Sequence, residues 1–149
     1  MGRMIPQRKY SVIEQTRYLQ NQFPNSTIRN IDHGFIWEAE LRPSSLSQLY
    51  RVKLEFKRGH HPDVYIVSPK LQLAKGAVKL EHVYSTKEQH LCIYHRPSNE
   101  WGDTLLIAKT IVPWISEWLL HYEIWLITGA WHGGGISHEK KKPVSAANP

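Results

Sequence analysis

Residues 81–95 read EHVYSTKEQHLCIYH and contain Cys92, the only cysteine of this 149-residue chain. His90 and His95 stand two and three residues from it, and Trp101 follows before a long apolar segment begins. A thiol can accept an acyl group from another thioester and then present an activated carbonyl to an amine. Cys92 is therefore the candidate nucleophile, with the role of a small buried hydrophobic side chain as the alternative.

The composition is typical of one globular domain. Hydrophobic residues make up 41% of the chain, and six Trp and seven Tyr can fill a sizeable core. A single cysteine excludes an internal disulfide, and the residues from Met1 to Pro6 lack the apolar stretch and cleavage site of a signal peptide. We therefore expect a cytoplasmic protein in a reducing compartment.

Neither a membrane nor a nucleic acid is an expected partner. The longest apolar stretch, Leu105 to Thr128, contains charged residues such as Lys109 and Glu117, which are costly at bilayer depth. This stretch is predicted to be a buried helix. The net charge is +6, but the basic residues are dispersed and Lys140 to Lys142 form a run only in the tail.

Hydrophobic periodicity predicts an α+β fold. Phe35 to Leu41 and Tyr50 to Phe56 alternate apolar and polar residues, and Asp63 to Pro69 supplies a shorter third strand. A further strand near Ile28 to Ile31 is predicted to precede them. The spacing of apolar residues between Pro6 and Phe23 predicts an N-terminal amphipathic helix. The strands then form an antiparallel meander with one wet face.

The second half begins with a weak pattern. After Pro69 the pattern weakens through Gly76 to Ser85, and a long irregular passage, the cysteine-bearing loop, is predicted to lead to Cys92 and on to Asn99. Helical periodicity resumes at Asp103 or Thr104, both candidate N-caps, and Pro113 is expected to kink the helix or restart it as a second one. Gly133 to Gly135 is expected to end it. The predicted core stripe of this helical segment is Ile107, Ile111, Trp114, Ile115, Trp118, Tyr122, Trp125 and Leu126.

With these elements in this order, the chain resembles the ubiquitin-conjugating E2 fold. That family carries a His-Pro-Asn triplet ten residues before the active cysteine. Here His82 lies ten residues before Cys92, with Val83 and Tyr84 in the Pro and Asn places. The family also has a Trp shortly after the cysteine and just before a helix, which Trp101 matches.

Departures from the E2 pattern indicate a bacterial branch. The family's Asn is missing at Tyr84, and the ending Thr128 to Gly135 is unlike that of eukaryotic E2 enzymes. With its Trp-rich segment around Trp114, the chain looks most like the stand-alone E2-like proteins of short type II CBASS antiphage operons. The resemblance implies an E2-like domain over residues 5–132, with C-terminal Trp-rich helices. The Gly-, Lys- and Pro-containing composition of residues 133–149 predicts a flexible tail.

This resemblance implies a conjugating enzyme of bacterial immunity. Cys92 would carry the C-terminus of a cGAS-like nucleotidyltransferase as a thioester, supplied by an E1-like activating enzyme or an equivalent. It would then pass that C-terminus to an amine on a target protein. Two alternatives stay open, a catalytically inactive E2-variant binding module and a Cys-His hydrolase. Exposure of Cys92 distinguishes the conjugating enzyme from the inactive module.

Several residues are candidates for assisting the thiol. His90 and His95 are candidate bases or oxyanion donors. Tyr84 is a candidate hydroxyl donor, although packing is its favoured role. The resemblance implies structural roles for His82 and Trp101. Because no cationic residue is adjacent in sequence, we expect no strongly acidified thiol.

The nine histidines do not form a metal-ligand pattern. His60 and His61 are adjacent, so their side chains diverge on a strand, and Glu117 and His121 have i, i+4 spacing without a third ligand nearby in sequence. We predict no metal and no small-molecule cofactor.

Overall fold

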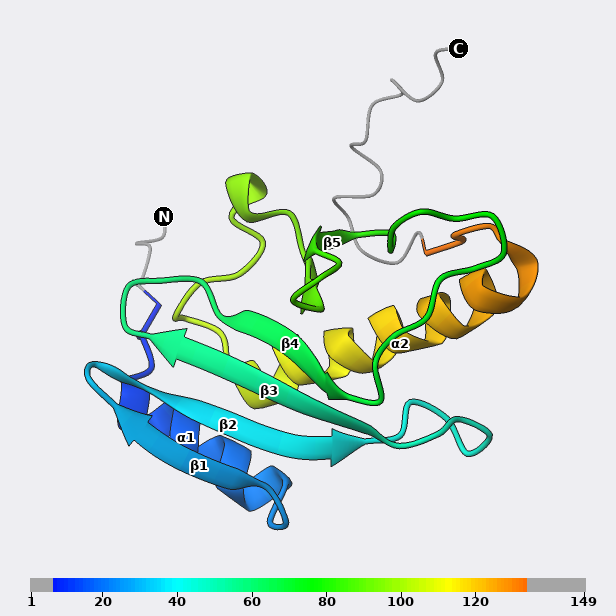
Figure 1. Cartoon of the computed structure of the whole chain (residues 1–149). Helices are drawn as coiled ribbons and strands as arrows, with labels where there is room; N and C mark the ends of the chain where they lie inside the picture. Colours follow the sequence, from blue (N-terminus) through cyan, green and yellow to red (C-terminus); the bar gives the residue numbers. More distant parts are fainter. Residues whose placement is uncertain (1–6, 134–149) are drawn as a thin grey trace, which may run out of the picture.

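The computed structural model describes residues 7–133, in which a six-stranded antiparallel sheet packs against two α-helices (Figure 1). The strands, in the spatial order β1-β2-β3-β4-β6-β5, are β1 Thr27–Ile31, β2 Gly34–Leu41, β3 Tyr50–Lys57, β4 Asp63–Ser68, β5 Val83–Ser85 and β6 His90–Leu91. The helical elements are α1 Val12–Gln22, the 3₁₀ turns η1 Arg96–Ser98 and η2 Ile107–Lys109, and α2 Ile111–Thr128. The predicted α+β class and antiparallel meander are confirmed.

Both helices cover the same face of the sheet. Phe23, which follows α1, packs edge-on against Trp37 of β2, with ring centroids 5.6 Å apart. Tyr122 of α2 packs edge-on against Tyr50 of β3 at 6.5 Å. Trp37 and Tyr50 belong to the buried alternating positions of their strands, as the period-2 pattern predicts. We call this the inner face; residues at the other alternating positions form the outer face.

Helix α1 begins at Val12, so the predicted start near Pro6 is wrong. Ser11 is the N-cap: its hydroxyl accepts from the Glu14 amide at 3.1 Å, and the Glu14 carboxylate accepts from the Ser11 amide at 2.9 Å. This reciprocal capping box satisfies amides that the first helical turn leaves unpaired. Just before it, the Tyr10 amide donates to the Asp103 carbonyl at 2.7 Å, a long-range bond outside the helix.

The predicted helix start at Asp103 or Thr104 is also wrong, because the 3₁₀ turn η2 intervenes and α2 begins at Ile111. Pro113 neither kinks nor restarts α2, since it lies in the first turn, where an amide has no intrahelical acceptor to lose. A single helix therefore replaces the predicted pair. The predicted stripe is confirmed as core, with Trp114 and Leu126 partly buried at its margin. Among residues 7–133, no helix combines the length and the apolar content needed to cross a membrane.

Helix α2 ends at Thr128 and is capped by Gly129, four residues before the triglycine that was expected to end it. Gly129 adopts a left-handed conformation with φ 79°, and its amide donates to the Trp125 carbonyl at 2.7 Å. Glycine pays no steric penalty there. Of the triglycine, only Gly133 is described; the rest, with the predicted flexible tail, lies outside the described residues.

Substitution Gly129→Ala is expected to lower the free energy of unfolding by about 1 kcal/mol, because the added Cβ strains a positive-φ cap. Urea denaturation measures this loss. Gly102→Ala is the matched control, since a Cβ there meets nothing within 4 Å and the backbone is not at positive φ. Equal stability of the two variants would contradict a capping role for Gly129.

Candidate active site

Cys92 lies in a loop, as predicted, but it directly follows a short hairpin made by β5 and β6, which the predicted irregular passage did not include. Strands of three and two residues are too short to show an alternating pattern. The Cys92 amide donates to the His82 carbonyl at 3.0 Å, which continues the pairing beyond the hairpin. The buried Gln89 side chain fixes the turn by donating to the Thr86 carbonyl and accepting from the Leu71 amide.

The strand register aligns three side chains in a row on the outer face. Lys53 of β3 is paired with Tyr65 of β4, and Tyr65 is paired with His90 of β6. The Lys53 ammonium lies 4.9 Å from the Tyr65 ring centroid, and the Tyr65 and His90 rings stack at 4.5 Å. Cys92 directly follows β6, two residues beyond His90.

A β-bulge brings Tyr84 to the same place. Ser85 pairs with His90 and Val83 pairs with Leu91, so Tyr84 is an extra residue on β5. A regular ladder would put Tyr84 opposite Leu91, which is buried on the inner face. The bulge re-aims the side chain, and the Tyr84 ring packs against His90 with centroids 4.8 Å apart.

The Tyr84 side chain lies beside Cys92. Burial raises the pKa of Tyr84, and its interaction with the Cys92 side chain raises it further, so the phenol is neutral at physiological pH and can donate. Cys92 is partly exposed, and its S–H points to the Tyr94 carbonyl at 3.6 Å. A neutral hydroxyl donor is therefore next to the cysteine.

Arg96, in the turn η1, packs on the Tyr84 ring. Its guanidinium carbon lies 4.7 Å from the Tyr84 ring centroid, and one of its nitrogens donates to the Pro62 carbonyl at 3.0 Å and to Asp63 Oδ1 at 2.8 Å. The same Asp63 oxygen accepts from His90 Nε2 at 3.0 Å. Burial lowers the pKa of Arg96, but the hydrogen bond to Asp63 and nearby charges outweigh it, so the pKa is raised.

The candidate histidines have different surroundings. His90 stacks on Tyr65, packs at a tilt against Tyr84 and is bonded to Asp63. His95 Nδ1 lies 2.7 Å from the Ser98 hydroxyl, within the turn that carries Arg96. His90 is thus built into the support of Tyr84, and the role of His95 toward the thiol stays a prediction.

His82 and Trp101 both make contacts between elements that are distant in the sequence. The His82 carbonyl accepts from Trp118 Nε1 of α2 at 3.1 Å as well as from Cys92, and its ring packs on Trp131 at 4.8 Å. Trp101 packs on Phe56 and donates to the Thr110 hydroxyl at 2.9 Å, at the start of α2. Both sets of contacts suit the structural roles that the resemblance implies.

A family model for the Type II CBASS E2 protein matches residues 15–139. The chain belongs to this family. The match spans the whole sheet, the β5–β6 hairpin with Cys92, and α2, and it confirms the resemblance to bacterial E2-like proteins of CBASS systems. A comparison with curated proteins finds no match to the chain.

Asp63 and Arg96 are the site residues that sequence reasoning missed in this CBASS E2-like protein. Arg96 is four residues from Cys92 along the chain, but only residues adjacent to the cysteine entered the expectation about its charge environment. Asp63 is separated from Arg96 by 33 residues and meets it through the strand register. A basic residue shortly after the cysteine was the one available signal.

The histidines of this E2-like protein are not gathered for metal binding in the part of the chain that the structure describes, where no three His, Cys, Asp or Glu side chains converge to hold an ion. His60 Nδ1 lies near the Arg58 carbonyl, whereas His61 Nδ1 lies 2.5 Å from the Tyr94 hydroxyl. The Glu117 and His121 side chains approach to 3.9 Å on α2.

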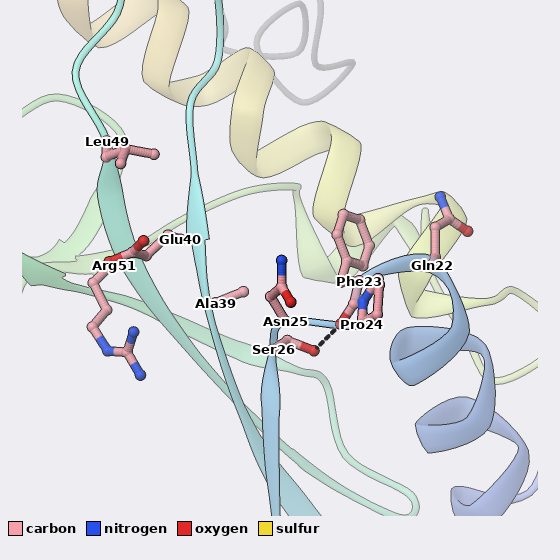
Figure 2. Close-up of a pocket in the computed structure, with 9 residues that line it drawn as sticks. All are labelled: Gln22, Phe23, Pro24, Asn25, Ser26, Ala39, Glu40, Leu49 and Arg51. Atoms are coloured by element: carbon pink, nitrogen blue, oxygen red, sulfur yellow. Dashed lines mark hydrogen bonds between the residues drawn. The ribbon is translucent and has the colours of Figure 1, made fainter.

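A separate hollow of about 480 Å³ lies where the end of α1 meets β2 and β3 (Figure 2). Its lining is Gln22, Phe23, Pro24, Asn25, Ser26, Ala39, Glu40, Leu49 and Arg51. The Ser26 hydroxyl donates to the Phe23 carbonyl at 2.6 Å, so it serves the local turn. This described lining holds no cysteine or histidine, so the hollow offers neither a thiol nor an imidazole.

Proposed function

We propose that Cys92 accepts the C-terminus of a partner protein as a thioester and transfers it to an amine on a target, as part of CBASS antiphage defence. The observation that carries this proposal is the partly exposed Cys92, directly after the β5–β6 hairpin, with the polar Tyr84 side chain brought beside it by the β5 bulge. Membership of the Type II CBASS E2 family supports a transfer reaction. A buried structural cysteine would need neither exposure nor a polar partner.

The reaction has two acyl transfers. First, the Cys92 sulfur attacks the thioester carbonyl held by an E1-like enzyme or an equivalent, and the E1 thiol leaves with the electron pair of the broken C–S bond. Second, a target amine forms a C–N bond to the same carbonyl carbon, and the Cys92 sulfur leaves. We propose a cGAS-like nucleotidyltransferase as the protein carried, and a reducing cytoplasm as the compartment.

The test is to co-express the protein with its operon neighbours and to compare wild type with Cys92→Ala on non-reducing gels. We expect a higher-mass adduct that requires Cys92 and disappears with thiol reductant. Hydroxylamine at neutral pH should also release it, since this reagent cleaves thioesters but not disulfides. Absence of any adduct, with defence intact in Cys92→Ala, would instead identify an inactive E2-shaped binding module.

A Cys-His hydrolase is the second candidate, because His90 is held by a carboxylate, as such an enzyme requires of its histidine. The hydrolase would shorten or release its protein substrate without joining it to an amine. Mass spectrometry of the co-expressed neighbours distinguishes the two, because a conjugate contains an isopeptide bond and a hydrolysed product ends in a free carboxylate.

A further inference from the structure

We propose that Tyr84 and Arg96 form a thiol-activating pair, in which the Tyr84 hydroxyl donates to the Cys92 sulfur when it is a thiolate and Arg96 holds Tyr84 in position. This inference deepens the proposed function, since it rests on Cys92 being the acyl carrier. In this pair Tyr84 is the catalytic member, because its hydroxyl would contact the reacting sulfur, and Arg96 is a positioning residue.

The Tyr84 ring needs support because it belongs to a three-residue edge strand and is 46% exposed. Two side chains supply it. The His90 ring packs against the Tyr84 ring at 4.8 Å between centroids, and the Arg96 guanidinium packs over it at 4.7 Å as a cation–π contact. These contacts hold the ring beside Cys92, whose side chain contributes to the raised pKa of the Tyr84 hydroxyl.

The Asp63 carboxylate fixes the positions of both side chains that pack on Tyr84. Asp63 Oδ1 accepts from Arg96 at 2.8 Å and from His90 Nε2 at 3.0 Å. The Pro62 carbonyl takes a further hydrogen bond from Arg96 at 3.0 Å. A guanidinium held at two acceptors and stacked on a ring has little rotational freedom left. Tyr84 is therefore already in position when the sulfur becomes charged, and no reorganisation of the site is needed at that moment.

Charge on sulfur is common to both acyl transfers, because the thiolate is the nucleophile when Cys92 is loaded and the leaving group when it is discharged. During discharge the C–N bond forms, the C–S bond breaks with its electron pair on Sγ, and the proton lost by the amine goes to solvent. A hydrogen bond to the thiolate favours that charged form. The titratable groups in the elements around the thiol are Asp63, Tyr65, His82, Tyr84, His90, Tyr94, His95 and Arg96.

The experiment is the pH dependence of iodoacetamide alkylation of the full chain, which reports one site because Cys92 is the only cysteine. Tyr84→Phe keeps the ring and removes the hydroxyl, so the alkylation midpoint should rise by about 1 pH unit. At a pH below the midpoint, the alkylation rate of Tyr84→Phe should be only about threefold lower than that of wild type, because a more basic thiolate is also a stronger nucleophile.

Arg96→Gln should raise the midpoint by a smaller amount, and it should add nothing in the Tyr84→Phe background, because Arg96 acts through Tyr84. The matched controls are Tyr18→Phe, on α1, and Arg42→Gln, whose side chain likewise donates to a backbone carbonyl, that of Ser47. Both controls should leave the wild-type profile unchanged.

An unchanged profile in Tyr84→Phe would overturn the proposal. A full additional shift from Arg96→Gln in the Tyr84→Phe background would also overturn it, because the guanidinium would then act on the sulfur directly. The assay needs no partner protein, so its failure is distinguishable from failure of the proposed function. A Tyr84-dependent profile in a chain that never forms an adduct would support the Tyr84–Arg96 pair and contradict the acyl-carrier role.

Discussion

Cys92→Ser is expected to trap the carried protein as an oxyester that survives thiol reductant, while transfer to the target amine nearly stops. An alkoxide is a much poorer leaving group than a thiolate, so the bond to the carried protein persists. A serine hydroxyl is also a weak nucleophile unless a base activates it, so loading is slow. Loss of a catalytic nucleophile costs on the order of a thousandfold or more in turnover, and transfer should fall accordingly.

The readout is a time course on reducing gels of the loaded species and of the conjugate. Cys92→Ala is the matched control, because it has the same backbone and no hydroxyl, and it should show neither species. Conjugate formed by Cys92→Ser at the wild-type rate would contradict thiol-based transfer by this chain.

The central strands and the long helix were predictable because their buried residues recur along the sequence with the period of a strand or a helix. In β3, polar residues such as Lys53 and Glu55 alternate with buried ones such as Leu54, and the alternation runs for eight residues. In α2, the buried residues Ile115, Trp118, Tyr122 and Trp125 follow helical spacing over an 18-residue helix. Each pattern repeats often enough to be recognised without a partner element.

The support around the thiol was not predictable in this way, because it depends on register. Tyr84 reaches the outer face through a bulge in a three-residue strand, and no periodicity marks such an irregularity. Asp63 and Arg96 meet only after β4 has paired with β6. Sequence reasoning could therefore identify Cys92 as the candidate nucleophile, but it assigned packing to Tyr84 and left out the cation that packs on it.

Gln15 is a further case in which tertiary contacts override local pattern. The apolar positions of the N-terminal helix did not include it, yet its side chain is fully buried. Its Nε2 donates to the Leu105 carbonyl at 2.9 Å, and its Oε1 accepts from the Ile107 amide at 2.9 Å. This one amide ties α1 to η2, just ahead of α2, and satisfies two backbone groups that no helix or strand pairs.

Gln15→Leu is expected to lower the free energy of unfolding by about 3 kcal/mol, because a buried amide and a buried carbonyl each lose a partner at about 1–3 kcal/mol, partly offset by the apolar side chain. Urea denaturation measures the loss. Gln20→Leu on the same helix is the matched control, since Gln20 is exposed and its bond to the Ser26 carbonyl is long, at 3.4 Å. It should change stability by less than about 0.5 kcal/mol. If both variants unfold at the same urea concentration, the junction of α1 with η2 is held by apolar packing rather than by the Gln15 amide.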